Sequence, residues 1–345
     1  MRTLLGALFG TRLNAVITLL MLGFFALVVP PFFRWAVQDA VWEAASRAGC
    51  TQAGACWAFI HARFALFFFG TYPADERWRV AVAFFVLLAW LIATMGAKRH
   101  RGWWLAGLAF VVPPVCGVLL AGGLFGLRAV STADWGGLML NVTLSFVALG
   151  GSLPLGIALA FGRRSPYPIL RLFCTIMIEF WRGVPLLTVL FMGLILLPIV
   201  LPAELRIDNL LRALVVLTLF TSAYMAETIR GGLQGVPPGQ AEAAAALGMH
   251  PAQVQLLVVL PQAMRVSIPG IVNIAVDLFK DTSLVSIVGL FDLMGVVNQS
   301  LKDTSWLGLA TEGYVFAAIV FFLACLVISL AGAVLERRFG ASLRR

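Results

Sequence analysis

Charged residues are scarce in this chain. Only 12% of its 345 residues are Asp, Glu, Lys or Arg, and 61% are hydrophobic. Soluble proteins carry about 25% charged residues, so this composition excludes the soluble globular classes. Several apolar blocks run for roughly 17 to 25 residues, which suits helices that cross the hydrocarbon core of a membrane. The sequence therefore predicts an all-α polytopic membrane protein.

Groups that bind nucleotides, hold metals or catalyse reactions are also missing. None of the three lysines follows a glycine, so the chain has no Walker A loop to cradle the phosphates of ATP. Its histidines are isolated and show no metal-ligand spacing: His61, His100 and His250. We expect no catalytic site, metal site or cofactor on this chain, so any ATP-driven step must use ATP and Mg²⁺ on a partner.

The net charge of +9 would suggest a nucleic-acid partner in a soluble protein. Here the basic residues sit in short loops and at the termini, where the positive-inside rule places them. We therefore expect contact with membrane lipid and none with nucleic acid. About eight spanning segments are predicted, with the basic groups all on one side, so both termini are expected in the cytoplasm: 14–33, 80–96, 103–124, 137–161, 172–200, 209–229, 266–289 and 312–335.

The chain divides near residue 130. Residues 1–130 hold three spans and an external loop at 34–79, whereas 131–340 hold five spans and the motifs described below. The first apolar run is long for a signal peptide and lacks a small-x-small cleavage site after it, so we interpret it as a retained helix. The external loop contains Cys50 and Cys56, which either form a disulfide in an oxidising compartment, remain free thiols or act between subunits.

A water-compatible segment at 237–261 separates two strongly apolar blocks and reads PPGQAEAAAALGMHPAQVQLLVVLP. Its prolines favour helix starts, and its Ala-rich stretch has high helix propensity. We expect a helix over 240–247 with Glu242 in its first turn, and a left-handed stop at Gly248. A second short helix is expected to begin at Pro251 and to end at Leu260-Pro261. The predicted product is a compact knob with a small-residue face.

The spacing EAA-x3-G-x9-(Ile/Val)-x-Leu-Pro in this segment resembles the cytoplasmic coupling loop of ABC-importer permeases, which docks into a groove on a separate ATPase subunit. The resemblance assigns this coupling role to Glu242, Ala243, Ala244, Gly248, Leu260 and Pro261. Other stretches follow the polar amino acid uptake subfamily in the same order: NVTLS at 141–145, EFWRGVPLL at 179–187, SAYMAETIRGG at 222–232 and KDTSL at 280–284. The likeness covers about 131–340 and implies a five-helix importer core of type I. The extension and its Cys-containing loop look most like the general L-amino acid and glutamate/aspartate systems.

Ionisable residues within spans are costly and usually face a cavity or a partner. Asp277, Lys280 and Asp281 lie at i, i+3 and i+4, so Lys280 has a carboxylate within reach on one helix face. This suits either a polar patch for a zwitterion on the translocation pathway or ions at the outer interface. Glu179 and Arg182 precede a Gly-Val-Pro break, which favours either a bent helix along the pathway or a structural ion pair. We interpret Glu227 and Arg230 as an interfacial pair that braces the coupling loop. The predicted pathway set is Glu179, Arg182, Gly183, Pro185, Tyr224, Met225, Lys280, Asp281, Thr282 and Ser283.

The resemblance implies a non-catalytic permease subunit in a bacterial inner membrane. It implies three kinds of protein partner: an ABC ATPase dimer, a periplasmic amino-acid-binding protein and a second permease subunit, which the extension suggests is related but not identical. An ion-gradient-driven secondary transporter would also explain the spans, but it leaves the EAA-x3-G segment unexplained, and no inverted repeat is visible. A membrane enzyme lacks any supporting constellation of residues.

Overall fold

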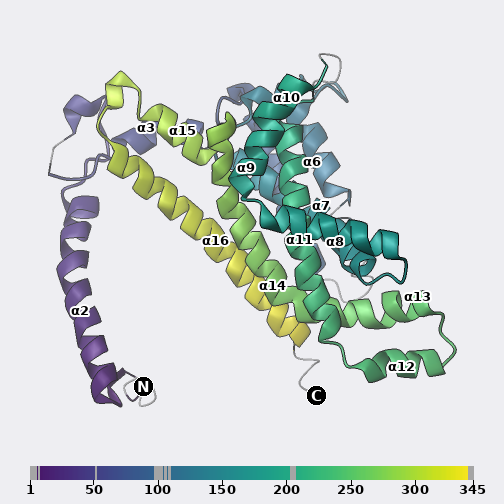
Figure 1. The fold of residues 1–345 in the computed structure, drawn as a ribbon. Helices are drawn as coiled ribbons and strands as arrows, with labels where there is room; N and C mark the ends of the chain where they lie inside the picture. Colours follow the sequence, from purple (N-terminus) through teal and green to yellow (C-terminus); the bar gives the residue numbers. More distant parts are fainter. Residues whose placement is uncertain are drawn as a thin grey trace. The chain divides into compact units, whose positions relative to one another are not determined.

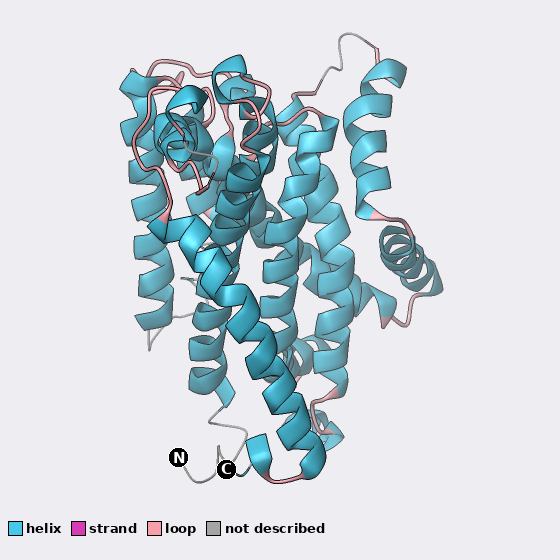
Figure 2. Ribbon diagram, turned by 90° about the vertical axis from the view of Figure 1, so that its left-hand side faces the viewer, coloured by secondary structure: helices cyan, strands magenta, loops and turns pink. Residues whose placement is uncertain are grey.

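The computed structural model describes residues 8–50, 53–96, 110–202 and 207–340, together with the single positions 6, 104 and 107. In these ranges the chain is almost wholly helical and contains no strand (Figure 2). The α-helices are α2 (Arg12–Phe33), α3 (Ala58–Phe69), α4 (Arg77–Gly96), α6 (Val112–Ala121), α7 (Gly137–Arg163), α8 (Pro168–Gly183), α9 (Leu186–Phe191), α10 (Leu197–Val200), α11 (Asn209–Gln234), α12 (Pro238–Ala246), α13 (Pro251–Gln253), α14 (Leu260–Asp281), α15 (Leu293–Ser300) and α16 (Ala310–Gly340) (Figure 1).

Five helical segments in the described ranges are long and apolar enough to cross a membrane: Arg12–Gln38, Ala74–Thr94, Gly137–Arg163, Asn209–Gln234 and Ala310–Arg338. A bent pair, Pro168–Gly183 with Leu186–Val200, makes a sixth if it is counted as one span. The predicted number of eight is therefore not confirmed. The predicted span at 103–124 lies partly outside the described residues, and α6 within it has only 10 residues. α14, in the predicted span at 266–289, is not among these segments.

The predicted span at 172–200 is not one continuous helix. α8 ends at Gly183, and α9 begins after Pro185. The helical segments Pro168–Gly183 and Leu186–Val200 meet at an angle of 102°. The break falls at the predicted Gly-Val-Pro site, where Pro185 lacks an N–H and Val184 takes an extended conformation. The size of the bend follows from packing and is not predictable from the spacing.

The chain forms two compact units, one of residues 1–64 with 298–316 and one of residues 65–297 with 317–345. In the first unit, Cys50 and Cys56 are paired as a disulfide with Cα atoms 5.7 Å apart. The backbone N–H of Cys56 donates to the Glu312 carboxylate over 3.2 Å, and Arg63 forms an ion pair with Asp303. These contacts hold the segment after α2 against the start of α16.

The predicted external loop at 34–79 contains a helix, α3, that the sequence did not predict. Twelve residues span about 18 Å, which is too short for a membrane crossing and explains why hydropathy did not single this helix out.

Small residues let α7, α11 and α14 pack closely in the second unit. A Cβ at Gly156 of α7 would lie 2.7 Å from the Met225 side chain of α11, and a Cβ at Gly151 would lie 2.9 Å from Thr218. The Ser267 hydroxyl of α14 donates to the Thr228 carbonyl of α11 over 3.2 Å. Such contacts are typical of membrane helices, where glycine and hydroxyl side chains bring backbones together. These three helices form the scaffold that carries the segments described next.

Candidate functional site

The predicted knob is a helical hairpin at the end of α11 (Figure 1). α12 begins at Pro238, two residues earlier than predicted, because proline suits the first position of a helix. Glu242 consequently lies beyond the first turn, so its predicted place near the helix N-terminus is wrong. Its side chain is exposed, as is that of Ala243.

Gly248 ends α12 in a complete Schellman motif. Its φ is +81°, its N–H donates to the Ala245 carbonyl over 2.9 Å, and the N–H of Met249 donates to the Ala244 carbonyl over 3.3 Å. Both hydrogen bonds satisfy carbonyls that the helix end would otherwise leave free. The predicted left-handed stop is therefore present. A Cβ at Gly248 would meet no atom within 4 Å, so only the backbone conformation favours glycine within this chain.

The second helix of the knob does not end at Leu260-Pro261 as predicted. His250 and Gln253 form a capping box at the start of α13, which passes through a π-helical turn, Val254–Val259, directly into α14. Pro261 lies in the first turn of α14, where its missing N–H costs no helical hydrogen bond. The knob is therefore continuous with α14, a helix of the scaffold.

The two faces of the knob differ sharply. On the inner face, Ala244 is buried with Val254, Val259 and Ala263, in a cluster that also includes residues of α11. On the outer face, the side chain of Leu247 is 84% exposed beside Gly248, which is also exposed. A large aliphatic side chain and a bare glycine turn thus lie together on the surface, over a base that is packed onto the scaffold.

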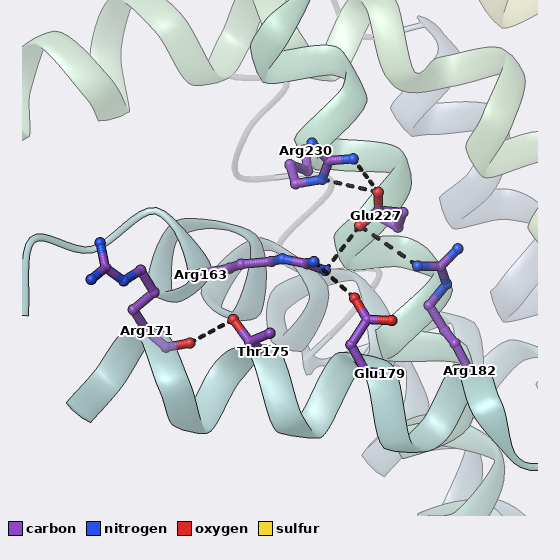
Figure 3. A network of polar contacts seen from close by, with 7 residues as sticks. All are labelled: Arg163, Arg171, Thr175, Glu179, Arg182, Glu227 and Arg230. Atoms are coloured by element: carbon purple, nitrogen blue, oxygen red, sulfur yellow. Dashed lines mark hydrogen bonds and ion pairs between the residues drawn. The ribbon is translucent and has the colours of Figure 1, made fainter. Parts of the chain in front are cut away.

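Three helices bring five charged side chains together next to this base (Figure 3). Glu227 of α11 accepts from Arg230 Nε over 2.9 Å, and its other oxygen lies 3.4 Å from Arg163 Nη1 of α7. Arg182 of α8 lies 3.8 Å from the same oxygen, and Glu179 pairs with Arg163 at 2.8 Å. Three guanidinium groups therefore face two carboxylates. We call these residues the α7–α8–α11 network.

The network changes how the predicted pairs are interpreted. Glu227 and Arg230 are paired, as predicted from their spacing. Glu179 and Arg182 are not paired with each other, because Arg163 and Glu227 approach them from other helices. The bend at Gly183 and Pro185 makes this possible, since it lays α8 across α11 (Figure 1).

Tyr224 and Met225 have different environments despite being neighbours. The Arg182 guanidinium lies 5.8 Å from the ring centroid of Tyr224, which is 37% exposed. Met225 is fully buried against Gly156, which is a packing position in this structure. Contact of either residue with a substrate stays a prediction.

The other predicted pathway residues lie at the far end of α14. Lys280 is about 30 Å along the helix from Leu260 at 1.5 Å per residue, and its ammonium lies 3.5 Å from Asp277, not from Asp281. The Thr282 and Ser283 hydroxyls donate to carbonyls three residues earlier, which fits the change to a 3-10 helix at Thr282. The structure thus divides the predicted set into two separate groups.

A buried polar cluster near Thr282 was missed by sequence reasoning. Asn141 Nδ2 donates to Thr282 and to Asp292, each over 2.9 Å, and all three side chains are fully buried. Asp292 also accepts from the Gly295 N–H over 2.9 Å and so caps α15. The one sequence signal for this cluster was an Asp three residues before Gly295, which suits a residue that caps the start of a helix. No sequence signal indicated the role of Arg163, because its partners lie on other helices.

Among the residues that the structure describes, no group of three or more His, Cys, Asp or Glu side chains is placed to hold a metal ion. The described site consists of an exposed knob, a packed base and a charged network that joins three helices.

Known proteins resemble this chain in sequence and in fold. Residues 152–341 match the family model described as binding-protein-dependent transport system inner membrane component. The chain is 48% identical over 334 residues to the inner membrane amino-acid ABC transporter permease protein YhdY of Escherichia coli, covering 96% of this chain and 91% of that protein. It is 36% identical to the glutamate/glutamine/aspartate/asparagine transport system permease protein BztC of Rhodobacter capsulatus, covering 96% and 92% of the two chains.

A solved structure described as an amino acid ABC transporter with histidines matches with a TM-score of 0.52 and 30% identity, covering 58% of this chain and 91% of that chain. The match to that shorter chain thus leaves much of this one uncovered, whereas the two relatives match nearly all of it. The predicted division near residue 130 stays a prediction. The family model and the near full-length relatives show that the chain belongs to the binding-protein-dependent transport system inner membrane components, as a multi-pass permease subunit of an ABC importer.

Proposed function

We propose that this chain forms the translocation pathway for amino acids, delivered by an external binding protein and driven by a separate ABC ATPase dimer. The observation that carries the proposal is the knob, whose exposed tip at Leu247 and Gly248 stands over a base packed into α11 and α14. The assignment of amino acids draws on the relatives, which are named as permeases for amino acids or for glutamate, glutamine, aspartate and asparagine.

The contacts on the inner side of the knob supply a route for coupling. Ala244 packs beside Ile229 and Leu233 of α11, so a force on α12 reaches the helix that carries Glu227. Glu227 is bound to Arg163 and Arg182, which lie on α7 and α8. Packed side chains and ion pairs shift as discrete units, so closure of the ATPase dimer would move these helices together. The network thus transmits the movement of the knob, and its exposed side chains border the translocation pathway.

The assembly requires partners that this chain does not contain. We propose a second permease subunit, related but not identical, and place both termini in the cytoplasm on the basis of the basic loops. Two proteins of Bacillus subtilis described as probable glutamine ABC transporter permease proteins, GlnM and GlnP, both match this chain, at 36% and 30% identity. The presence of two such permeases in one organism supports a heterodimer here. The Cys50–Cys56 loop is placed in the periplasm, where a disulfide persists.

The test is uptake in right-side-out membrane vesicles and in proteoliposomes, combined with mass spectrometry of what co-purifies with the tagged chain. We expect an ABC ATPase and a second permease in the preparation. Uptake should require ATP on the cytoplasmic side and the binding protein outside, and should survive collapse of the proton gradient by an ionophore.

A secondary transporter predicts the reverse. A preparation without ATPase that still transports amino acids on an ion gradient, and stops when the ionophore is added, would overturn the importer assignment. No feature of the described residues favours a secondary transporter over the importer that the knob supports.

A further inference from the structure

A cavity of about 640 Å³ lies at the N-terminal end of α11, about 39 Å from the end that carries the knob. Its walls come from the turn before α7, from α10, from the first turn of α11 and from the loop at 289–291. The volume lies within the range of small-ligand sites, which is about 300–1,000 Å³. All of these segments belong to the second compact unit.

A buried arginine lines this cavity without a carboxylate partner in the described part of the chain. Arg212 is 8% exposed. Its Nη1 donates to the carbonyl of Leu194 over 2.7 Å, and its other terminal nitrogen donates to the Asn209 side chain. Its Nε–H is buried and has no acceptor. A buried guanidinium satisfied only by neutral oxygens keeps its charge available for an anion.

A carboxylate lines the same cavity one helical turn away. Asp208 accepts from the Thr132 hydroxyl over 2.6 Å and caps α11 through the Leu211 N–H over 3.1 Å. Asp208 precedes the first residue of α11 as its N-cap, and no ion pair within 4.0 Å joins it to Arg212 among the described residues. Separate partners therefore hold the two opposite charges apart on the wall of one cavity.

A second residue that lines this cavity carries an unsatisfied donor. Trp135 is 5% exposed, and its indole Nε1–H has no acceptor. Trp135 also lines the apolar cavity between α4, α6 and α7. Buried donors are normally satisfied, so Trp135 and Arg212, which both line the cavity, depart from this rule.

We propose that this cavity binds a zwitterion, with its anionic group at Arg212 and its ammonium at Asp208. Two sources carry this chemistry: a free α-amino acid, and the headgroup of phosphatidylethanolamine. The amino-acid source rests on the proposed function, whereas the lipid source does not. If the ligand is a free amino acid, the cavity is an entry site for the substrate, at the end of α11 opposite the knob.

The test uses the complex as it purifies, in lipid nanodiscs, with the charge-neutral variants Arg212→Gln and Asp208→Asn. Asparagine keeps the cap on Leu211 through its single carbonyl oxygen, and its amide N–H can donate to the Thr132 hydroxyl, which then accepts. Asp208→Asn therefore removes the charge with little change of structure. Arg128→Gln and Asp75→Asn are the matched controls, because both residues are exposed and neither lines the cavity. Thermal melting of each variant confirms that it is folded.

One arm measures equilibrium binding of each standard L-amino acid and of its N-acetyl and amide analogues, which lack the ammonium or the carboxylate. The other arm measures phosphatidylethanolamine retained by native mass spectrometry from nanodiscs that also contain phosphatidylglycerol. We expect binding in one arm to weaken at least tenfold in both pocket variants and to stay unchanged in both controls.

Equal binding by wild type and pocket variants in both arms would overturn the proposal, as would a wild type that binds in neither arm. Blocked analogues that bind as well as the parent amino acid would also overturn it in the first arm. ATP-driven uptake by the wild-type complex is measured in parallel, so that failure of the importer function is seen separately from failure of the cavity.

Discussion

The coupling knob and the α7–α8–α11 network lie side by side, but they are specified in different ways. The turn of the knob depends on residues within a few positions of one another, ending in two hydrogen bonds around Gly248. The network joins Arg163 to Glu179 and Glu227, which are 16 and 64 positions away in the sequence. The surface that we propose as the docking site is thus encoded locally, whereas the network that we propose to receive its movement exists only after three helices have packed.

The largest expected effect comes from the tip of the knob. Gly248→Asp should abolish ATP-driven uptake while the protein still reaches the membrane. Aspartate tolerates a left-handed backbone, and a Cβ at this position meets no atom of the chain, so the turn should survive while a charged side chain blocks docking. Uptake in vesicles, with protein level in the membrane measured by immunoblot, is the readout.

Two further substitutions separate bulk from backbone strain at this position. Gly248→Asn adds bulk but accepts the left-handed conformation, whereas Gly248→Ala adds one methyl group at a cost of about 1 kcal/mol for the positive φ. If docking of the ATPase determines the rate of uptake, Gly248→Asn should impair uptake more than Gly248→Ala. A stronger defect in Ala would mean that the turn conformation, and not the exposed surface, is what matters.

A second effect is expected far from the knob, at the buried cluster of Asn141, Thr282 and Asp292. Asp292→Leu leaves the Gly295 N–H without an acceptor and removes a partner of Asn141, which should lower the free energy of unfolding by about 2–3 kcal/mol. The conservative Asp292→Asn keeps one oxygen for Gly295 and should lose less. Thermal unfolding in detergent measures both, and equal melting of Leu and wild type would contradict the assigned role.

Within the network, Glu227 and Glu179 provide an internal comparison. Glu227→Gln weakens contacts to three arginines at a position 23% exposed, and should cost about 1–2 kcal/mol after allowance for solvent screening. Glu179→Gln removes one contact at a position 53% exposed, and should cost about 0–1 kcal/mol. Uptake should fall more in the Glu227 variant. Indistinguishable variants would show that the network does not act through Glu227.

The smallest effect on coupling is expected in the first compact unit. Replacing Cys50 and Cys56 together by serine opens a short loop and should cost about 2 kcal/mol of local stability by loop entropy. Hydrogen exchange of residues 39–57 should rise, while ATPase activity stimulated by the binding protein stays unchanged. Loss of that stimulation in a well-expressed variant would mean that the loop takes part in coupling.

Local patterns explain which features were predictable from the sequence. The left-handed stop at Gly248 and the break before Pro185 follow from backbone preferences of single residues, and both were predicted. The continuation of the knob into α14 was missed because Pro261 suits the start of a helix as well as its end. The 102° bend, the pairing of Arg163 with Glu179 and the Asn141–Asp292 hydrogen bond all depend on tertiary packing, which spacing along the chain does not encode.

The most direct test of the central claim is the amount of ABC ATPase that co-purifies with the tagged chain in mild detergent. We expect wild type to retain the ATPase, Gly248→Asp to lose it and Glu227→Gln to retain it while transporting less. Full retention of the ATPase by Gly248→Asp, with normal uptake, would contradict the claim that this exposed turn is the docking surface.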